Sequence, residues 1–155
     1  MSDNSTKSAK NVKDLFSKDE EQWIKQAIMN AELDTSGEIR VHIENTCNGD
    51  VMDRAAFVFE KLNMHKTKLR TGVLIYLAVK NRKFAIIGDK GINKVVPGNF
   101  WDDIKQRMLN HFRNGEFTKG ITEAIRMAGN QLKDHFPYQS DDKNELSDEV
   151  SFGKN

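Results

Sequence analysis

The hydrophobic pattern is dominated by two short apolar runs joined by a charged turn. Val73 to Val79 contains no charged residue, and Phe84 to Ile87 follows after residues 80–83. Both runs are too short for an ordinary helix and are rich in Val, Ile and aromatic residues. They predict the two antiparallel strands of a hairpin. A strand that is apolar on both faces must be covered on both faces, so residues 73–79 are expected at the centre of a sheet flanked by helices.

Four other stretches have helical spacing. The first follows a capping box made by Ser17 and Glu20, and Trp23 beside its apolar stripe is expected to pack in the core. The second starts at Asp50 as N-cap and runs to about residue 62. The third starts near Asn99, after a loop predicted over residues 88–98. The fourth covers about residues 117–135 and ends before Pro137.

Between the first two helices, residues 38–44 alternate strictly between polar and apolar side chains. The alternation predicts a strand with one wet or polar-lined face, placed away from the centre of the sheet. The predicted order is therefore α-β-α-β-β-α-α, with a right-handed crossover joining two parallel strands. The predicted fold class is α/β: a small three-layer α/β/α sandwich around a mixed sheet of three to four strands.

The composition predicts one folded domain with two polar ends. At 155 residues the chain can bury one core. We expect a disordered arm over residues 1–13, a domain over residues 14–137 and an acidic tail over residues 138–155. Leu146, Val150 and Phe152 stand among the acidic residues of the tail, which is expected to be disordered unless these side chains pack.

Charge, cysteine content and hydropathy exclude several classes of function. The formal net charge of +1 gives no general attraction for nucleic acid. The single cysteine, Cys47, cannot form an internal disulfide and is expected to be a small loop or strand-end residue. The polar start of the chain does not resemble a signal peptide, and no apolar run approaches the length that spans a bilayer. We therefore expect a soluble, cytoplasmic protein.

Candidate chemistry gathers at one end of the predicted sheet. Glu38 begins one strand and Asp89 ends another, so these carboxylates could hold a water or a Ca²⁺ or Mg²⁺ ion and act as catalytic residues. Arg70, Lys90 and Lys94 could hold an anion such as phosphate. The alternative is that both carboxylates are solvated or paired with lysine.

Other polar groups carry weaker signals. Residues 45–53 and the hairpin turn lie at the opposite end, where parallel βαβ units usually bind ligands. The four histidines are scattered, without the spacing of a zinc site. The basic stretch 65–70 is either a solvated loop or a patch that docks an acidic partner or phosphate.

Spaced motifs across about residues 16–137 resemble the TPM domain family, in particular its soluble bacterial members. The residues that carry the resemblance are Gly37-Glu38-Ile39, Gly72-Val73-Leu74, Gly88-Asp89-Lys90-Gly91, Trp101, Phe112, Gly115 and Gly120-Ile121. The family includes a thylakoid-lumen phosphatase-like domain and a receptor accessory protein, and its fold is a small α/β/α sandwich. The resemblance implies that fold here.

The resemblance also implies two functions. The family often has Asp-Asn before the Gly-Val-Leu strand, where this chain has Arg70 and Thr71. A guanidinium in place of a carboxylate removes a metal ligand and repels a cation, while Glu38 and Asp89 remain. We therefore expect a binding or accessory module for a membrane-associated or multiprotein assembly, with a protein partner. The alternative is a weak metal-assisted phosphatase acting on phosphomonoesters.

Overall fold

The computed structural model describes residues 15–139 and 144–153. The predicted arm over residues 1–13 lies outside the described residues. The described helices and strands follow the predicted order and add a short strand near the C-terminus. They are α2 (Lys18–Glu32), β1 (Glu38–Glu44), α3 (Val51–Lys61), the 3-10 turn η2 (Met64–Lys66), β2 (Gly72–Ala78), β3 (Lys83–Gly88), α4 (Lys90–Asn93), α5 (Asp102–Arg113), α6 (Phe117–His135) and β4 (Ser151–Phe152).

The sheet has the strand order β3-β2-β1-β4. β1 and β2 are parallel, β2 and β3 are antiparallel, and β4 is parallel to β1. The mixed sheet and its hairpin are therefore confirmed. The position of β1 away from the centre is wrong, because β4 covers part of its outer edge.

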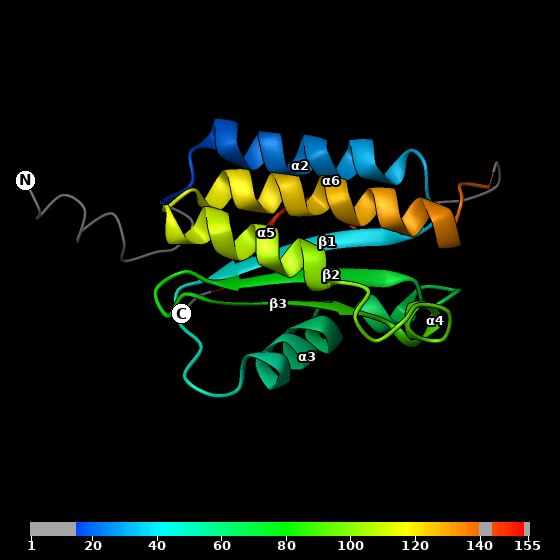
Figure 1. Ribbon diagram of the computed structural model, residues 1–155, viewed down its shortest axis with the longest axis horizontal. Helices are drawn as coiled ribbons and strands as arrows, with labels where there is room; N and C mark the ends of the chain where they lie inside the picture. Colours follow the sequence, from blue (N-terminus) through cyan, green and yellow to red (C-terminus); the bar gives the residue numbers. More distant parts are fainter. Residues whose placement is uncertain (1–14, 140–143, 154–155) are drawn as a thin grey trace, which may run out of the picture.

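Helices cover the two faces of the sheet and complete the predicted three-layer sandwich (Figure 1). α2, α5 and α6 lie on one face, where α6 packs against both α2 and α5. α3 lies on the other face and contacts β2 and β3. Every residue of β2 is buried, as its apolar sequence predicts. Its side chains alternate between a large core under α2, α5 and α6 and a smaller core under α3.

Local signals predicted the helices with few errors. The capping box of α2 is present, because Glu20 N–H donates to Ser17 Oγ and Ser17 N–H donates to Glu20 Oε1. Asp50 caps α3 by accepting hydrogen bonds from two backbone N–H groups. α6 has the predicted bounds, whereas α5 begins at Asp102 rather than near Asn99. Within the predicted loop 88–98, residues 90–93 form the one-turn helix α4.

Trp23 is the clearest error of the helix analysis. Its side chain lies on the outside of α2 and is 60% exposed, while Ile24 and Ile28 supply the buried face. The sequence pattern could not separate the two, because Trp23 precedes the first buried isoleucine and extends the apolar stripe by one position.

The described part of the acidic tail is ordered against the domain, unlike the disorder expected for it. Residues 144–153, called the C-terminal strap below, run beside β1, and Ser151–Phe152 form β4. Leu146 packs against the smaller core, and Val150 and Phe152 pack against the larger one. The apolar side chains among the acidic residues therefore anchor the strap to the sheet.

Candidate functional site

Three of the five site residues predicted from the sequence line one cleft at the end of the sheet where β2 begins. Arg70, Asp89 and Lys90 surround a cleft of about 410 Å³, together with His65 and Glu60. The Nδ1 atom of His65 is buried and has no hydrogen-bond partner among the described residues. The cleft thus offers cationic, anionic and neutral polar groups to a ligand.

The centre of this cleft is a bidentate ion pair. Arg70 Nε and Nη2 donate to the two carboxylate oxygens of Asp89, at 2.6 and 2.9 Å. This contact raises the pKa of Arg70. Asp89 is buried and also accepts from Lys90 N–H, so it caps α4. Both carboxylate oxygens of Asp89 are therefore already engaged by protein groups.

The backbone around the ion pair has little room to move. Arg70 has a φ of 57°, which a non-glycine residue adopts only at a cost in conformational energy. Gly91 N–H donates to the carbonyl oxygen of Arg70 at 3.0 Å. A Cβ atom on Gly91 would lie 2.2 Å from the carbonyl oxygen of Leu69. The absence of a side chain at Gly91 thus permits the loop to place the Arg70 guanidinium over Asp89.

Glu38 and Lys94 lie apart from this cleft. Glu38 is buried at the start of β1, where its Oε1 accepts a hydrogen bond of 2.6 Å from Leu146 N–H of the C-terminal strap. Burial raises the pKa of Glu38 to about 7, and the neighbouring Glu145 carboxylate adds to the shift. Lys94 follows α4 and is exposed. The structure therefore brings Arg70, Asp89 and Lys90 together, and it does not add Glu38 or Lys94 to them.

The donor set does not fit a Ca²⁺ or Mg²⁺ ion at these carboxylates. Within residues 15–139 and 144–153 there is no group of three or more His, Cys, Asp and Glu side chains that could hold a metal ion. Hard divalent cations require several oxygen ligands, whereas Asp89 gives both of its oxygens to Arg70. The guanidinium supplies the positive charge that a cation would bring.

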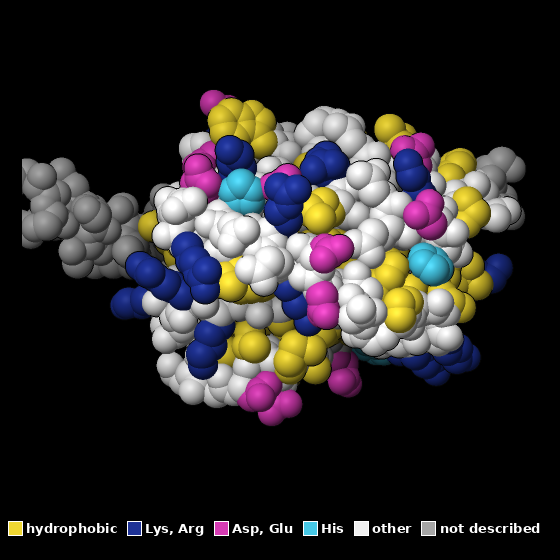
Figure 2. Space-filling view, viewed as in Figure 1, with side chains coloured by type: hydrophobic (Ala, Val, Ile, Leu, Met, Phe, Trp, Pro, Cys, Tyr) yellow, Lys and Arg dark blue, Asp and Glu magenta, His cyan; other side chains and the backbone are white. Residues whose placement is uncertain are grey.

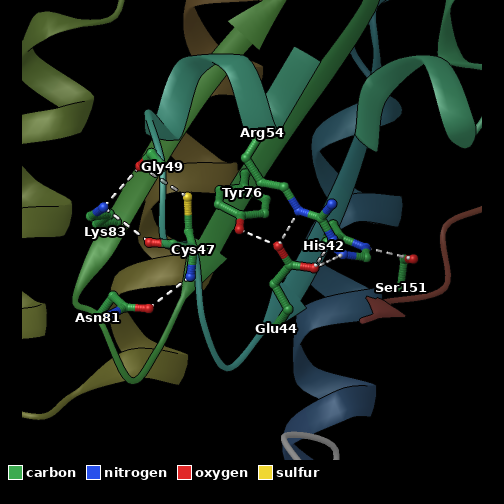
Figure 3. A network of polar contacts seen from close by, with 9 residues as sticks. All are labelled: His42, Glu44, Cys47, Gly49, Arg54, Tyr76, Asn81, Lys83 and Ser151. Atoms are coloured by element: carbon green, nitrogen blue, oxygen red, sulfur yellow. Dashed lines mark hydrogen bonds and ion pairs between the residues drawn. The ribbon is translucent and has the colours of Figure 1, made fainter. Parts of the chain in front are cut away.

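A second polar cluster, at the opposite end of β1, was not predicted. The Glu44 side chain is fully buried and accepts hydrogen bonds from three residues (Figure 3). Arg54 Nε and Nη2 donate to it at 2.7 and 2.8 Å, and the Tyr76 hydroxyl also donates to it. His42 Nε2 lies 3.1 Å from Glu44 Oε1, the oxygen that also accepts from Arg54 Nη2. We call these residues, with Ser151, the Glu44 network.

The Glu44 network joins four elements through one carboxylate. It links β1 to Tyr76 of β2, to Arg54 of α3 and, through His42 Nδ1 at 2.9 Å, to Ser151 Oγ of β4. Burial alone would raise the pKa of Glu44, but the hydrogen bonds from Arg54, His42 and Tyr76 outweigh it and lower that pKa well below its ordinary range. Burial and the Glu44 charge raise the pKa of Tyr76. The cluster is thus a fixed buried charge with satisfied partners.

The loop after β1 extends this cluster towards the hairpin turn. Lys83 Nζ donates to the carbonyl oxygens of Cys47 and Gly49, and the Asn81 side chain accepts from Cys47 N–H (Figure 3). The Cys47 side chain is buried against the smaller core and lies near the Gly49 carbonyl oxygen of its own loop, as expected for a structural loop residue. A shallow cleft of about 420 Å³ lies beside this loop and is lined by Arg54, Asp50 and Asp53.

The outer side of α2 is a third feature that the sequence did not reveal. Trp23, Met29 and Leu33 are 60%, 42% and 69% exposed, and Tyr138 beside the end of this helix is 51% exposed. Apolar side chains are visible over both ends of α2 (Figure 2). A groove of about 490 Å³ runs between α2 and α6, and one of about 330 Å³ runs between α2 and the strap. We call these four side chains the α2 surface.

Comparison with solved structures finds one relative of high sequence identity and two domains that share the fold. The chain is 47% identical to BA42 from the psychrophilic bacterium Bizionia argentinensis, with a TM-score of 0.84, over 89% of this chain and 95% of that one. It also matches the N-terminal domain of cg2496 from Corynebacterium glutamicum, at 13% identity and a TM-score of 0.61, over 76% of this chain and 74% of that one. An N-terminal domain from P. gingivalis matches at 20% identity and a TM-score of 0.64, over 79% of each chain.

The last two matches support the fold alone, because their identities are low. A search of curated proteins found no match. In the part of the chain that the structure describes, no helix is both long enough and apolar enough to cross a membrane. The model of the TPM domain matches residues 10–131, which is most of the chain. The chain belongs to the TPM domain family.

Proposed function

We propose that this TPM domain is a cytoplasmic binding module that docks a protein of a membrane-associated or multiprotein assembly on the α2 surface. One observation carries the proposal: α2 exposes Trp23, Met29 and Leu33 although its inner face is fully used by the core. Exposed large apolar side chains that gather on one surface mark interaction sites more often than isolated ones do.

The shape of the α2 surface also suits a protein partner. Met29 and Leu33 line the groove between α2 and the strap, and Trp23 is exposed nearer the start of α2. The groove on the α6 side is lined by small apolar side chains and by Lys119, Arg126 and other polar residues. Aromatic residues and methionine are enriched at protein interfaces, and tryptophan is among the residues that most often dominate their energetics.

The test compares two variants of the full chain in cells. Trp23→Ala/Leu33→Ala removes apolar area from the α2 surface, and Phe57→Ala removes a ring of similar exposure, 56%, from α3. Both should keep the wild-type unfolding midpoint, because neither site is in the core. We expect cross-linking and quantitative mass spectrometry to identify a partner that the first variant loses by at least about tenfold. Equal loss or equal retention in both variants would contradict the proposal.

A specific observation favours the alternative, a metal-assisted phosphatase. Glu38 has a pKa raised to about 7, so it can hold a proton near neutral pH, as a general acid must. Two contacts oppose it: Leu146 N–H binds the Glu38 carboxyl, and Arg70 holds Asp89. A catalytic pair would have to break both contacts before it could bind a metal ion and a phosphate together.

A phosphatase assay distinguishes this alternative from the binding module. We expect the wild-type protein to show no metal-dependent hydrolysis of a generic phosphomonoester when Mg²⁺ or Ca²⁺ is added. The reason is that the Arg70 guanidinium binds both carboxylate oxygens of Asp89. Arg70→Asp should increase calcium binding in calorimetric titration, since it adds a carboxylate beside a freed one. Turnover by the wild type that depends on metal and is abolished by Asp89→Ala would instead establish the phosphatase.

A further inference from the structure

The outer edge of β1 is only partly covered by a strand. β1 has seven residues, but β4 pairs with His42 and Ile43 alone, and Gly153 N–H then donates to the carbonyl oxygen of Ile43. Towards the start of β1, Ile39 N–H donates to the Glu32 carboxylate instead of to a strand. The edge therefore has room for a longer strand than the one that lies on it.

The C-terminal strap is held by apolar anchors and a few ionic contacts. Leu146 packs against the smaller core, and the Phe152 ring lies 6.2 Å from that of Phe16. Lys25 Nζ lies 2.5 Å from the Glu149 carboxylate, and Lys68 N–H donates to Glu145 at 3.1 Å. An exposed ion pair such as that of Lys25 and Glu149 contributes less than about 1 kcal/mol, and the Lys68 contact is one exposed hydrogen bond from the backbone N–H. The strap is thus held mainly by side chains that another peptide could supply.

Other contacts oppose the strap. Asp148 faces Glu32 and Glu145 faces Glu38, so the strap sets one carboxylate against the half-buried Glu32 and another against the buried Glu38. Asp148 Oδ1 is buried without a hydrogen-bond partner among the described residues, and Arg40 Nε is in the same state. Unsatisfied buried polar atoms cost free energy. The strap therefore fits the groove incompletely.

We propose that the edge of β1 and its flanking groove accept an extended acidic segment of a partner protein, which displaces the C-terminal strap and adds a longer parallel strand. Addition of a strand to an exposed edge takes its affinity from main-chain hydrogen bonds and its specificity from side-chain pockets. The strap indicates the chemistry of the incoming segment. The segment should carry carboxylates that face Lys25 and Arg40. It should also carry apolar residues at the spacing of Leu146, Val150 and Phe152. The strap lies after residues 10–131, the part of the chain that the family model matches.

The groups around the strap give docking a defined pH dependence. Burial and the neighbouring Asp148 carboxylate raise the pKa of Glu32 to about 9, and burial raises that of Glu38 to about 7. A carboxyl with a raised pKa in the docked state contributes stability below its ordinary pKa and loses it as the pH rises through the raised value. The cations facing the strap, Lys25 and Arg40, keep their charge across this range. Docking should weaken from pH 6 to pH 9.

The experiment uses a full chain in which the strap is released. A Cβ atom on Gly153 would lie 2.5 Å from Glu44 Oε1, whereas one on Gly49 would meet nothing within 4 Å. Leu146→Ala/Gly153→Ala should therefore free the edge, and Gly49→Ala is the matched control. The probe is a fluorescent peptide with the sequence of residues 144–153, and fluorescence anisotropy measures its binding.

We expect the released variant to bind this peptide saturably, at least about tenfold more tightly than the wild type or Gly49→Ala, whose edge is occupied. Binding should weaken from pH 6 to pH 9 and should persist in the released variant carrying Trp23→Ala/Leu33→Ala, which separates this groove from the α2 surface. Circular dichroism checks that each variant is folded. If the double variant does not fold, the single variant Leu146→Ala is used in its place.

Three results would overturn the proposal. One is the absence of peptide binding to a folded, released variant. Another is equal binding of a scrambled peptide of the same composition, which would indicate only charge attraction. The third is a wild-type dimer in light scattering that dissociates when the peptide is added, because the occupant would then be the strap of a second copy.

Discussion

Replacing Glu44 with alanine should lower the free energy of unfolding by about 3 kcal/mol, because the change leaves the buried Tyr76 hydroxyl without its acceptor and the partly exposed Arg54 guanidinium without its partner. Arg54, Tyr76 and His42 all contact this one carboxylate, and Tyr76 is fully buried. The Tyr76 hydroxyl would lose the carboxylate that accepts its hydrogen bond. Urea unfolding followed by circular dichroism measures the effect.

The control for this prediction is Glu60→Ala, since Glu60 is an exposed acidic residue of α3. It should change the free energy of unfolding by less than about 0.5 kcal/mol. A double-mutant cycle of Glu44→Gln with Arg54→Met then isolates the ion pair, because the double variant removes both partners and so cancels the separate effects of the two single changes. A loss below about 1 kcal/mol for Glu44→Ala would contradict a structural role for the network.

The same carboxylate predicts the acid sensitivity of the fold. The pKa of Glu44 is lowered in the folded state, so its contribution to stability is present above the ordinary pKa of glutamate and is lost as the pH falls towards the lowered value. The difference in unfolding free energy between wild type and Glu44→Gln should therefore shrink on acidification. A difference that grows as the pH falls would reverse the sign and exclude this explanation.

Replacing Gly91 with alanine should destabilise the domain by about 3 kcal/mol, because the new methyl group has no space. It would lie 2.2 Å from the carbonyl oxygen of Leu69 and 2.6 Å from that of Arg70, and both obstacles are backbone atoms. The loop must move, and Arg70 moves with it. We expect thermal unfolding to show a lower midpoint and NMR spectra to show shifted resonances for Arg70 and Asp89.

Gly98→Ala is the matched control, because a Cβ atom there meets nothing within 4 Å. It should leave the unfolding midpoint within a few degrees of the wild type. If Gly91→Ala behaved in the same way, the loop that carries Arg70 would be more adaptable than the close approach at Gly91 indicates. The left-handed backbone of Arg70 would then not be enforced by its neighbour.

The sequence predicted those parts of the fold that depend on neighbouring residues. The bounds of α6, the capping box of α2 and the buried central strand all follow from spacing within a single segment. α4 was missed because one helical turn is too short to show a period. The predicted topology also placed Arg70, Asp89 and Lys90 at one end of the sheet, where they share a cleft, although it grouped Glu38 and Lys94 with them.

Contacts between distant segments could not be predicted in this way. The polar residues of β1 were predicted to form a wet or polar-lined face, and the sequence could not decide between the two. His42 and Glu44 are buried, so this end of the face is lined by polar groups and is not wet. Their partners lie far along the chain: Tyr76 is 32 residues from Glu44, and Ser151 is 109 residues from His42. One available signal was the tyrosine in the apolar run, since a buried hydroxyl needs a polar partner on the adjacent strand.

The contrasting environments of the two tryptophans give the protein two built-in optical reporters. Trp101 is 7% exposed and packs edge to face against Phe100, so its emission reports on the integrity of the core. Trp23 is 60% exposed, so its emission reports on the polarity of the outer face of α2. A red shift on denaturation arises mainly from Trp101, whereas a blue shift in the native protein arises from Trp23 becoming covered. One unlabelled spectrum can therefore distinguish loss of the fold from occupation of a surface.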